Sequence, residues 1–284
     1  MKQLLFIVML ILSFCSNRTN KSFYDAVQAQ QVIQVGAERT ELYLPKLRGK
    51  RVGLIVNQTS RIADKHLVDY MLSSGIKVQR LFCPEHGFRG SADNGAVLED
   101  DIDALTQLPI ISLYGKKKKP AKEDLEGIDM LVFDIQDVGV RFYTYISTLH
   151  YVMEAAAENG VELIVLDRPN PNIHYIDGPI LDVKFSSFVG MHPVPVVYGM
   201  TIGEYAGMIN GEGWLKDNVQ CKLDVIPCHS YNRSMNYILP VKPSPNLASA
   251  NAIAHYPSLC FFEPTSIRIG RGTPHAFELI GQPG

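Results

Sequence analysis

A carboxylate, an imidazole and a guanidinium follow one another in the stretch Cys83-Pro84-Glu85-His86-Gly87-Phe88-Arg89-Gly90. The run from Ile76 to Phe82 precedes this stretch directly and has the apolar composition of a buried strand. Proline and glycine then favour a fixed turn. Because ligands of α/β sheets bind at the carboxyl ends of the strands, we expect Glu85, with His86 and Arg89 beside it, at the centre of a site.

Three other apolar runs of strand length (51–57, 128–137 and 161–166) also end in polar side chains. These side chains are Asn57, Asp134, Asp137, Asp167, Arg168 and Asn170. Asp137 is a candidate catalytic residue, and the others are candidates for substrate binding. In a parallel sheet the carboxyl ends of all these strands would face one crevice. Residues three apart on a strand point in opposite directions, so we expect one of the two aspartates of the second run to be structural and Asp137 to face the crevice.

Paired carboxylates of this kind are suited to glycoside cleavage, in which one carboxyl group protonates the leaving oxygen. Partial burial of Glu85 between aromatic residues would raise its pKa toward the range of a general acid. Arg141, Tyr143 and Tyr145 offer a cation, hydroxyl groups and rings, which together favour sugar binding. Arg271 lies between two glycines and could bind a carboxylate or a phosphate.

Strand-like and helix-like segments alternate along the chain. Helical patterns cover 66–72, 144–159 (ended by Gly160) and 201–215, the last with a capping box of Thr201 and Glu204. This alternation predicts an α/β fold with a doubly wound, mostly parallel sheet. We expect the acidic residues 99–103 to begin a solvated helix and residues 251–257 to form a junction.

The composition excludes several classes of function. A net charge of -2 over 284 residues gives no reason to expect nucleic acid as a partner. Neither a dinucleotide nor a P-loop glycine motif is present, and the cysteines lack zinc-site spacing, so we expect no cofactor and no metal. The lysine run from Lys116 to Lys119 is interpreted as a solvated loop.

The first residues have the pattern of a secretory signal, which we place at 1–22. Lys2 supplies a positive charge, and the apolar segment from Leu4 to Leu12 is too short to span a bilayer. Cys15 follows that segment, where a bacterial lipoprotein carries its lipid. We therefore expect export to the periplasm or the outer membrane, with any membrane contact made through a lipid anchor at Cys15.

Several long motifs together resemble the NamZ-type exo-β-N-acetylmuramidases, a family that long carried only a label of unknown function. In chain order they are CPEHGFRG, DIQDVGVRFYTYISTLHYVMEAAAENG, VLDRPNPN, SFVG, YGMTIGEYAGMIN, PSPN and GRGT. The resemblance extends from about Arg51 to Gly284. One departure is Pro264, which follows Glu263 where the family usually has a glycine.

The resemblance implies an exported glycosidase that releases N-acetylmuramic acid from the non-reducing ends of peptidoglycan fragments. It implies a Rossmann-like domain at 23–250 and the start of a smaller carboxyl-terminal domain at 251–284, which usually continues further, with the active site in the cleft between them. The family's proposed catalytic glutamate corresponds to Glu85. Arg89, Arg141 and Arg271 are candidates for binding the lactyl carboxylate of muramic acid. The alternatives are a non-catalytic cell-wall-binding lipoprotein and a hydrolase of another amino sugar or an ester.

Overall fold

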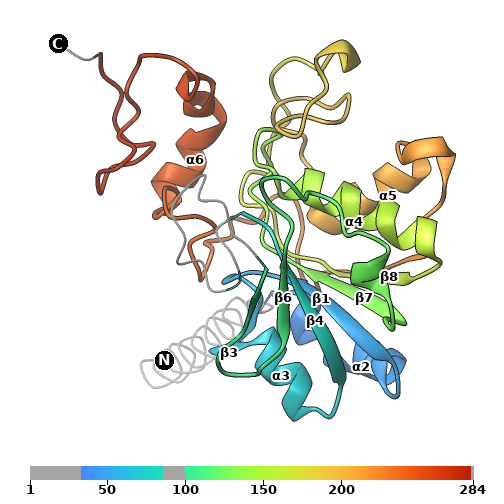
Figure 1. The fold of residues 1–284 in the computed structure, drawn as a ribbon. Helices are drawn as coiled ribbons and strands as arrows, with labels where there is room; N and C mark the ends of the chain where they lie inside the picture. The colour runs from blue at the N-terminus through green and yellow to red at the C-terminus, as the bar shows by residue number, and fades with distance from the viewer. Residues whose placement is uncertain (1–32, 86–87, 89–99, 283–284) are drawn as a thin grey trace, which may run out of the picture. The chain divides into compact units, whose positions relative to one another are not determined.

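A seven-stranded sheet organises the chain in the computed structural model, which describes residues 33–85, 88 and 100–282 (Figure 1). The strand order is β5-β6-β4-β1-β7-β8-β9, and every neighbouring pair is parallel except β5 with β6. The strands are β1 (Arg51–Val56), β4 (Lys77–Cys83), β5 (Asp101–Ile102), β6 (Pro109–Ser112), β7 (Met130–Asp134), β8 (Glu162–Leu166) and β9 (Leu223–Ile226). The predicted mostly parallel α/β sheet is therefore confirmed.

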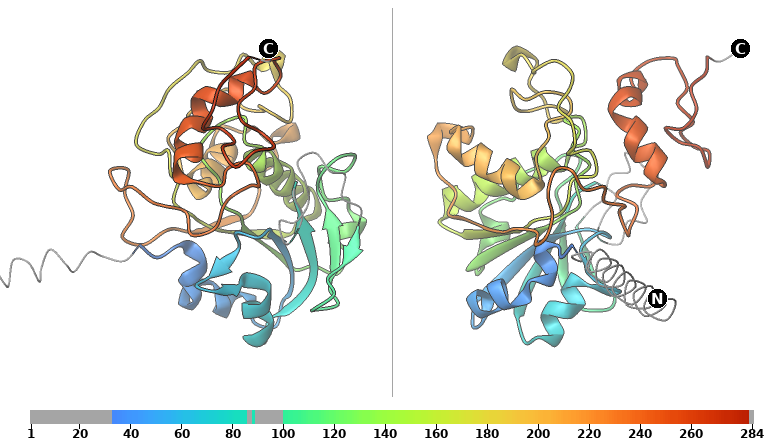
Figure 2. Two further views of the ribbon diagram at one scale, coloured as in Figure 1. Left: turned by 90° about the vertical axis from the view of Figure 1, so that its left-hand side faces the viewer. Right: turned by 180° about the vertical axis from the view of Figure 1, so that it is seen from behind.

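Helices cover both faces of the sheet, which explains why its central strands are apolar throughout (Figure 2). Along β7, Leu131 and Phe133 bury against one face, and Val132 buries against the other. The helices are α2 (Thr40–Leu47) and α3 (Leu67–Ser73) on the Val132 side, and α4 (Tyr145–Asn159) and α5 (Ile202–Gly211) on the opposite side. A separate two-stranded ribbon consists of β2 (Arg61–Ile62) and β3 (Lys65–His66).

The start of α5 and the end of α4 agree with the predicted boundaries and rest on local capping contacts, whereas α5 ends at Gly211 and not at residue 215. Thr201 accepts a hydrogen bond from the Glu204 backbone N–H, and the Glu204 carboxylate accepts one from the Thr201 N–H, which completes the expected capping box of α5. Gly160 ends α4 with a positive φ of 67°, a conformation that glycine adopts without strain. These two signals were readable because capping involves only residues close in sequence.

One expectation was wrong. The acidic residues from Asp101 do not begin a helix, because the backbone of Asp101–Ile102 pairs with β6 as an antiparallel edge strand. Residues 251–257, which we expect to form a junction, lie within α6 (Ala250–Leu259), whose start is capped by the Ser249 side chain. Ala252, Ile253 and Tyr256 of α6 bury in the same core as α4 and α5, so packing stabilises a helix that contains Pro257.

Short 3-10 helices connect the larger elements, at Gly36–Glu38, Glu123–Leu125, Val183–Phe185, Lys216–Asn218 and Cys260–Phe262. None of the helices in the described ranges has the length and apolar composition that crossing a bilayer requires. The predicted signal at 1–22 and its Cys15 lie outside the described residues.

Candidate active site

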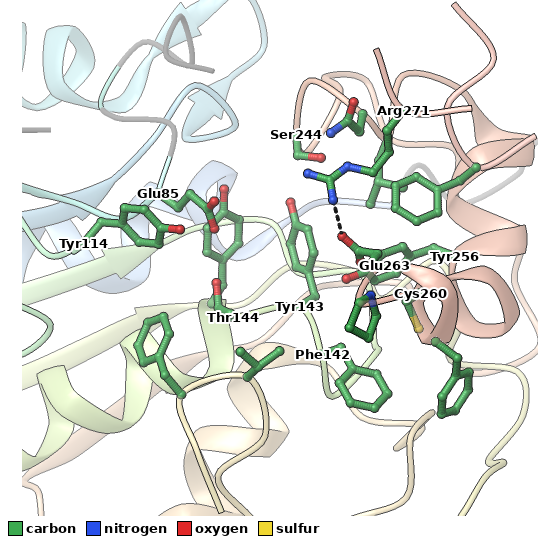
Figure 3. A pocket seen from close by; sticks show the side chains of 18 of the residues that line it. Glu85, Tyr114, Phe142, Tyr143, Thr144, Ser244, Tyr256, Cys260, Glu263 and Arg271 are labelled. Atoms are coloured by element: carbon green, nitrogen blue, oxygen red, sulfur yellow. Dashed lines mark hydrogen bonds and ion pairs between the residues drawn. The ribbon is translucent and has the colours of Figure 1, made fainter. Parts of the chain in front are cut away.

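A pocket of about 960 Å³ lies where strands β4, β6 and β7 end (Figure 3). Glu85 follows β4, Tyr114 and Lys118 follow β6, and the segment from Phe142 to Tyr145 joins β7 to α4. The remaining wall comes from later parts of the chain: Phe188, Val189, Ser244, Asn246, Leu247, Tyr256, Cys260, Phe261, Glu263, Pro264, Arg271 and Phe277. The pocket thus occupies the predicted end of the sheet, and three strand-end loops contribute to it.

Glu85 lies against Tyr114 in this pocket (Figure 3). A side-chain hydrogen bond joins the two, and burial, together with the nearby Glu85 carboxyl, raises the pKa of Tyr114 to about 12. The phenol therefore remains protonated at neutral pH and is the donor in this contact. Tyr114 thus orients the Glu85 carboxyl group within the pocket.

Glu263 is a second carboxylate in the same pocket, and sequence reasoning did not select it as a site residue. Its Oε2 lies 3.1 Å from Nη1 of Arg271 (Figure 3). Burial raises the pKa of Glu263, Arg271 opposes that change, and the nearby Glu85 carboxyl adds to it. The two glutamates therefore interact electrostatically across the pocket. The only sequence signal at this point was the departure at Pro264, because Glu263 follows no strand.

Aromatic rings form much of the wall between the two glutamates. The Tyr143 ring packs edge-on against Tyr145 at 4.8 Å and against Tyr256 at 5.9 Å between ring centroids. The Tyr143 hydroxyl donates to the Pro243 carbonyl at 2.8 Å, which fixes the ring. Such a rigid aromatic surface is suited to packing against a sugar ring.

Asp134 and Arg168, both expected to contact substrate, instead form a buried ion pair outside the pocket lining. Nε of Arg168 lies 2.6 Å from Oδ1 of Asp134, and neither side chain is more than 4% exposed. Asp167 also lies outside the pocket lining, and its two oxygens accept hydrogen bonds from Gly203 N–H and the Thr201 hydroxyl at the start of α5. These three strand-end residues join elements of the fold.

Asp137 and Arg141 are likewise buried rather than exposed to the pocket. The Asp137 carboxylate accepts hydrogen bonds from the Tyr198 hydroxyl and the Gly139 N–H. Burial raises the pKa of Asp137 to about 6, although these hydrogen bonds oppose the change. The Arg141 guanidinium donates to the carbonyls of Pro179 and Val194, so its charge is held within the fold.

Asn57 and Asn170 are also committed to internal contacts. The side-chain oxygen of Asn57 accepts hydrogen bonds from Thr59, and Asn170 donates to the carbonyl of Met200 at 2.8 Å. Of the residues expected at the site, the pocket brings together Glu85, Tyr143, Tyr145 and Arg271. His86 and Arg89 lie outside the described residues.

Within the ranges that the structure describes, no group of three or more His, Cys, Asp or Glu side chains is arranged to hold a metal ion. The pocket's titratable groups are carboxylates, phenols and cations, with the one thiol of Cys260. Burial raises the pKa of that thiol to about 12, so it is protonated at neutral pH. The arrangement is suited to proton transfer and charge stabilisation.

Comparison with known proteins identifies relatives over most of the chain. Two family models match, "Exo-beta-N-acetylmuramidase NamZ, N-terminal" over residues 52–251 and its C-terminal counterpart over residues 254–284. A peptidoglycan β-N-acetylmuramidase NamZ of Bacillus subtilis (strain 168) is 46% identical over 248 residues, which are 85% of this chain. The chain spans 59% of the length of that relative.

Two solved structures of DUF1343 family proteins from Bacteroides fragilis are also similar, each with a TM-score of 0.81. The first is 46% identical and is matched over 88% of this chain and 67% of its own. The second is 38% identical and is matched over 87% of this chain and 65% of its own.

Proposed function

Because the chain belongs to the NamZ family of exo-β-N-acetylmuramidases, we propose that it is a glycosidase acting on peptidoglycan fragments. It releases N-acetylmuramic acid from their non-reducing ends, and Glu85 is the general acid. The observation that carries this proposal is that Glu85 and Glu263 share one aromatic-lined pocket. The amino-terminal signal pattern supports a place of action outside the cytoplasm, where peptidoglycan lies, and we propose export as well.

The chemistry requires a proton for the leaving oxygen and negative charge near the anomeric carbon. Glu85, oriented by the Tyr114 hydroxyl, supplies the proton. We assign the negative charge to Glu263. Burial raises the pKa of Glu263, and the Arg271 guanidinium beside it opposes this change and favours the ionised carboxylate. As the glycosidic bond breaks, the sugar acquires positive charge, and Glu263 stabilises it. Glu85 then serves as the base that accepts a proton from the incoming water.

Replacing Glu85 with glutamine tests the proposal. For the disaccharide in which N-acetylmuramic acid is linked to N-acetylglucosamine, Glu85→Gln should lower kcat about a hundredfold or more, since general acid catalysis contributes that much. For a para-nitrophenyl glycoside of N-acetylmuramic acid, Glu85→Gln should lower kcat much less, because this leaving group needs little protonation. The measurement is release of free N-acetylmuramic acid or nitrophenol by purified protein.

Glu212→Gln is the matched control, because Glu212 is exposed and does not line the pocket. It should retain the activity of the parent protein on both substrates. Equal rates for the parent and Glu85→Gln on the disaccharide would remove Glu85 from the chemistry. Binding of the disaccharide without cleavage by the parent protein would instead favour the non-catalytic binding role.

A further inference from the structure

The cationic side chains near the pocket differ in the groups that they already contact. Arg271 is paired with Glu263, and the Arg141 guanidinium is bound by backbone carbonyls away from the pocket lining. Lys118 is the remaining cationic side chain among the described residues that line the pocket. A negatively charged ligand entering beside the Glu263 carboxylate needs such a positive charge to offset the repulsion between the two anions.

The sequence favoured a solvated loop for the lysine run from Lys116 to Lys119. In the structure, the side chains of this run make different contacts. Lys117 pairs with Asp124 at 3.3 Å, and Lys119 pairs with Glu154 at 2.6 Å. Lys118, between them, lines the pocket, and within the described part of the chain it forms no ion pair with a carboxylate. Its two neighbours therefore anchor the segment, and this anchoring directs Lys118 into the pocket.

An aromatic ring holds the Lys118 ammonium in place. Nζ lies 4.5 Å from the centroid of the Phe188 ring, and Phe188 also lines the pocket. A ring face attracts an ammonium without using its three N–H donors, which stay available for a ligand. The ring also displaces water from one side of the ammonium, so attraction to an anion is stronger there than in open solvent.

We infer that Lys118, seated on Phe188, is the residue that recognises the lactyl carboxylate of muramic acid. This inference rests on the proposed function. Muramic acid differs from glucosamine by a lactyl ether on the third ring carbon, and its carboxylate is ionised at neutral pH. Lys118 and Tyr114 belong to the same loop after β6, and Tyr114 contacts Glu85. The subsite for the carboxylate and the proposed general acid therefore share one wall, and Lys118 determines specificity for muramic acid.

The test compares Lys118→Met with Lys116→Met. Methionine retains an unbranched apolar stem against Phe188 but removes the charge, and Lys116 belongs to the same run but is exposed and outside the pocket lining. The substrates are the para-nitrophenyl glycoside of N-acetylmuramic acid and the same glycoside with the lactyl carboxylate converted to its carboxamide. These two substrates have nearly the same shape and differ in charge.

Lys118→Met should raise KM for the carboxylate substrate about 10- to 100-fold, the usual loss for a charge-assisted hydrogen bond, with kcat nearly unchanged. Lys118→Met should leave KM for the carboxamide substrate unchanged. Lys118→Arg should keep most of the parent's preference for the carboxylate over the carboxamide. Lys116→Met should have the same KM values as the parent. If Lys118→Met keeps the parent's preference for the carboxylate, the inference is overturned.

Failure of the proposed function is distinguishable from failure of this inference. If the parent protein hydrolyses neither glycoside, the proposed glycosidase function is wrong, and calorimetric binding of free N-acetylmuramic acid still tests the subsite. Binding at least tenfold weaker in Lys118→Met than in Lys116→Met would support the subsite. Equal binding by the two variants would contradict it.

Discussion

At the scale of single residues, Asp137 illustrates how a polar strand-end side chain can support a site without lining it. Its carboxylate accepts a hydrogen bond from the Gly139 N–H at 2.6 Å. Gly139 has a positive φ of 76° and begins the loop that carries Phe142 and Tyr143 into the pocket. We therefore interpret Asp137 as a positioning residue for this loop.

The raised pKa of Asp137, about 6, predicts a pH-dependent contribution to stability. Between about pH 4 and pH 6 the native state retains a proton that the unfolded state has lost, so this contribution to the free energy of unfolding falls as pH rises. The free energy of unfolding of Asp137→Asn, relative to that of the parent, should therefore rise by on the order of 3 kcal/mol between about pH 4 and pH 7. Urea denaturation at the two pH values measures this difference.

The comparison with the parent isolates Asp137 from groups that act in the opposite direction. Burial lowers the pKa values of His150 and His192, so their contribution is lost as pH falls below the usual histidine range. Asp64→Asn, at an exposed position, is the control and should show no such pH-dependent gain. A difference between Asp137→Asn and the parent that does not change with pH would contradict the assignment.

At the scale of elements, the start of α5 is joined to the end of β8. Asp167, directly after β8, accepts hydrogen bonds from the Thr201 hydroxyl at 2.8 Å and from the Gly203 N–H at 2.7 Å. The Thr201 side chain also accepts a hydrogen bond from the Glu204 N–H. One hydroxyl therefore both caps a helix and binds it to the sheet.

Thr201→Ala should destabilise the protein by about 1 to 3 kcal/mol, because it removes a helix cap and a hydrogen bond to a buried carboxyl group. Thr201→Ser keeps the hydroxyl and should lower the free energy of unfolding much less. Thr40→Ala, at the first residue of α2, is the control at a helix start where the N-cap residue makes no side-chain capping bond. Chemical denaturation of the parent and the three variants measures their free energies of unfolding. Equal stability of Thr201→Ala and the parent would contradict the role of Thr201 in capping α5 and joining it to the sheet.

At the scale of the whole molecule, both regions matched by the family models contribute to one pocket. Glu85 and Lys118 belong to the region 52–251, and Glu263 and Arg271 belong to the region 254–284. The site is therefore assembled from residues far apart in sequence, and its shape depends on the packing of α6 against the core.

Export and lipid attachment stay predictions that concern the whole chain. We predict that the protein leaves the cytoplasm, and that labelled palmitate is incorporated at Cys15 in a bacterial host with a lipoprotein pathway. Cys15→Ser should abolish labelling and release the protein from the membrane fraction, whereas Cys228→Ser should do neither. Deletion of residues 4–12 should retain the protein in the cytoplasm. Unchanged labelling of Cys15→Ser would contradict the anchor, and export after the deletion would contradict the signal.

Local signals in the sequence were sufficient for the central strands, for the boundaries of α3 and α4 to within a residue, for the start of α5 and for the mostly parallel sheet. Continuous apolar runs such as that of β7 indicate burial on both faces, and caps such as Thr201 with Glu204 act between near neighbours. The same reasoning predicted that Glu85 lies at the carboxyl end of a strand, where the pocket is found. Patterns among residues close in sequence were enough to predict these features, although the sheet itself pairs strands that are far apart in the chain.

Tertiary packing decided which polar side chains line the pocket. Asp134 and Arg168 are as polar as Glu85 and also lie at the carboxyl ends of strands, but they pair with each other because their strands are neighbours in the sheet. Glu263, which comes after α6, and Lys118, which comes after β6, line the same pocket as Glu85. No local pattern encodes these positions, since a side chain's burial and its partner depend on elements distant in the chain.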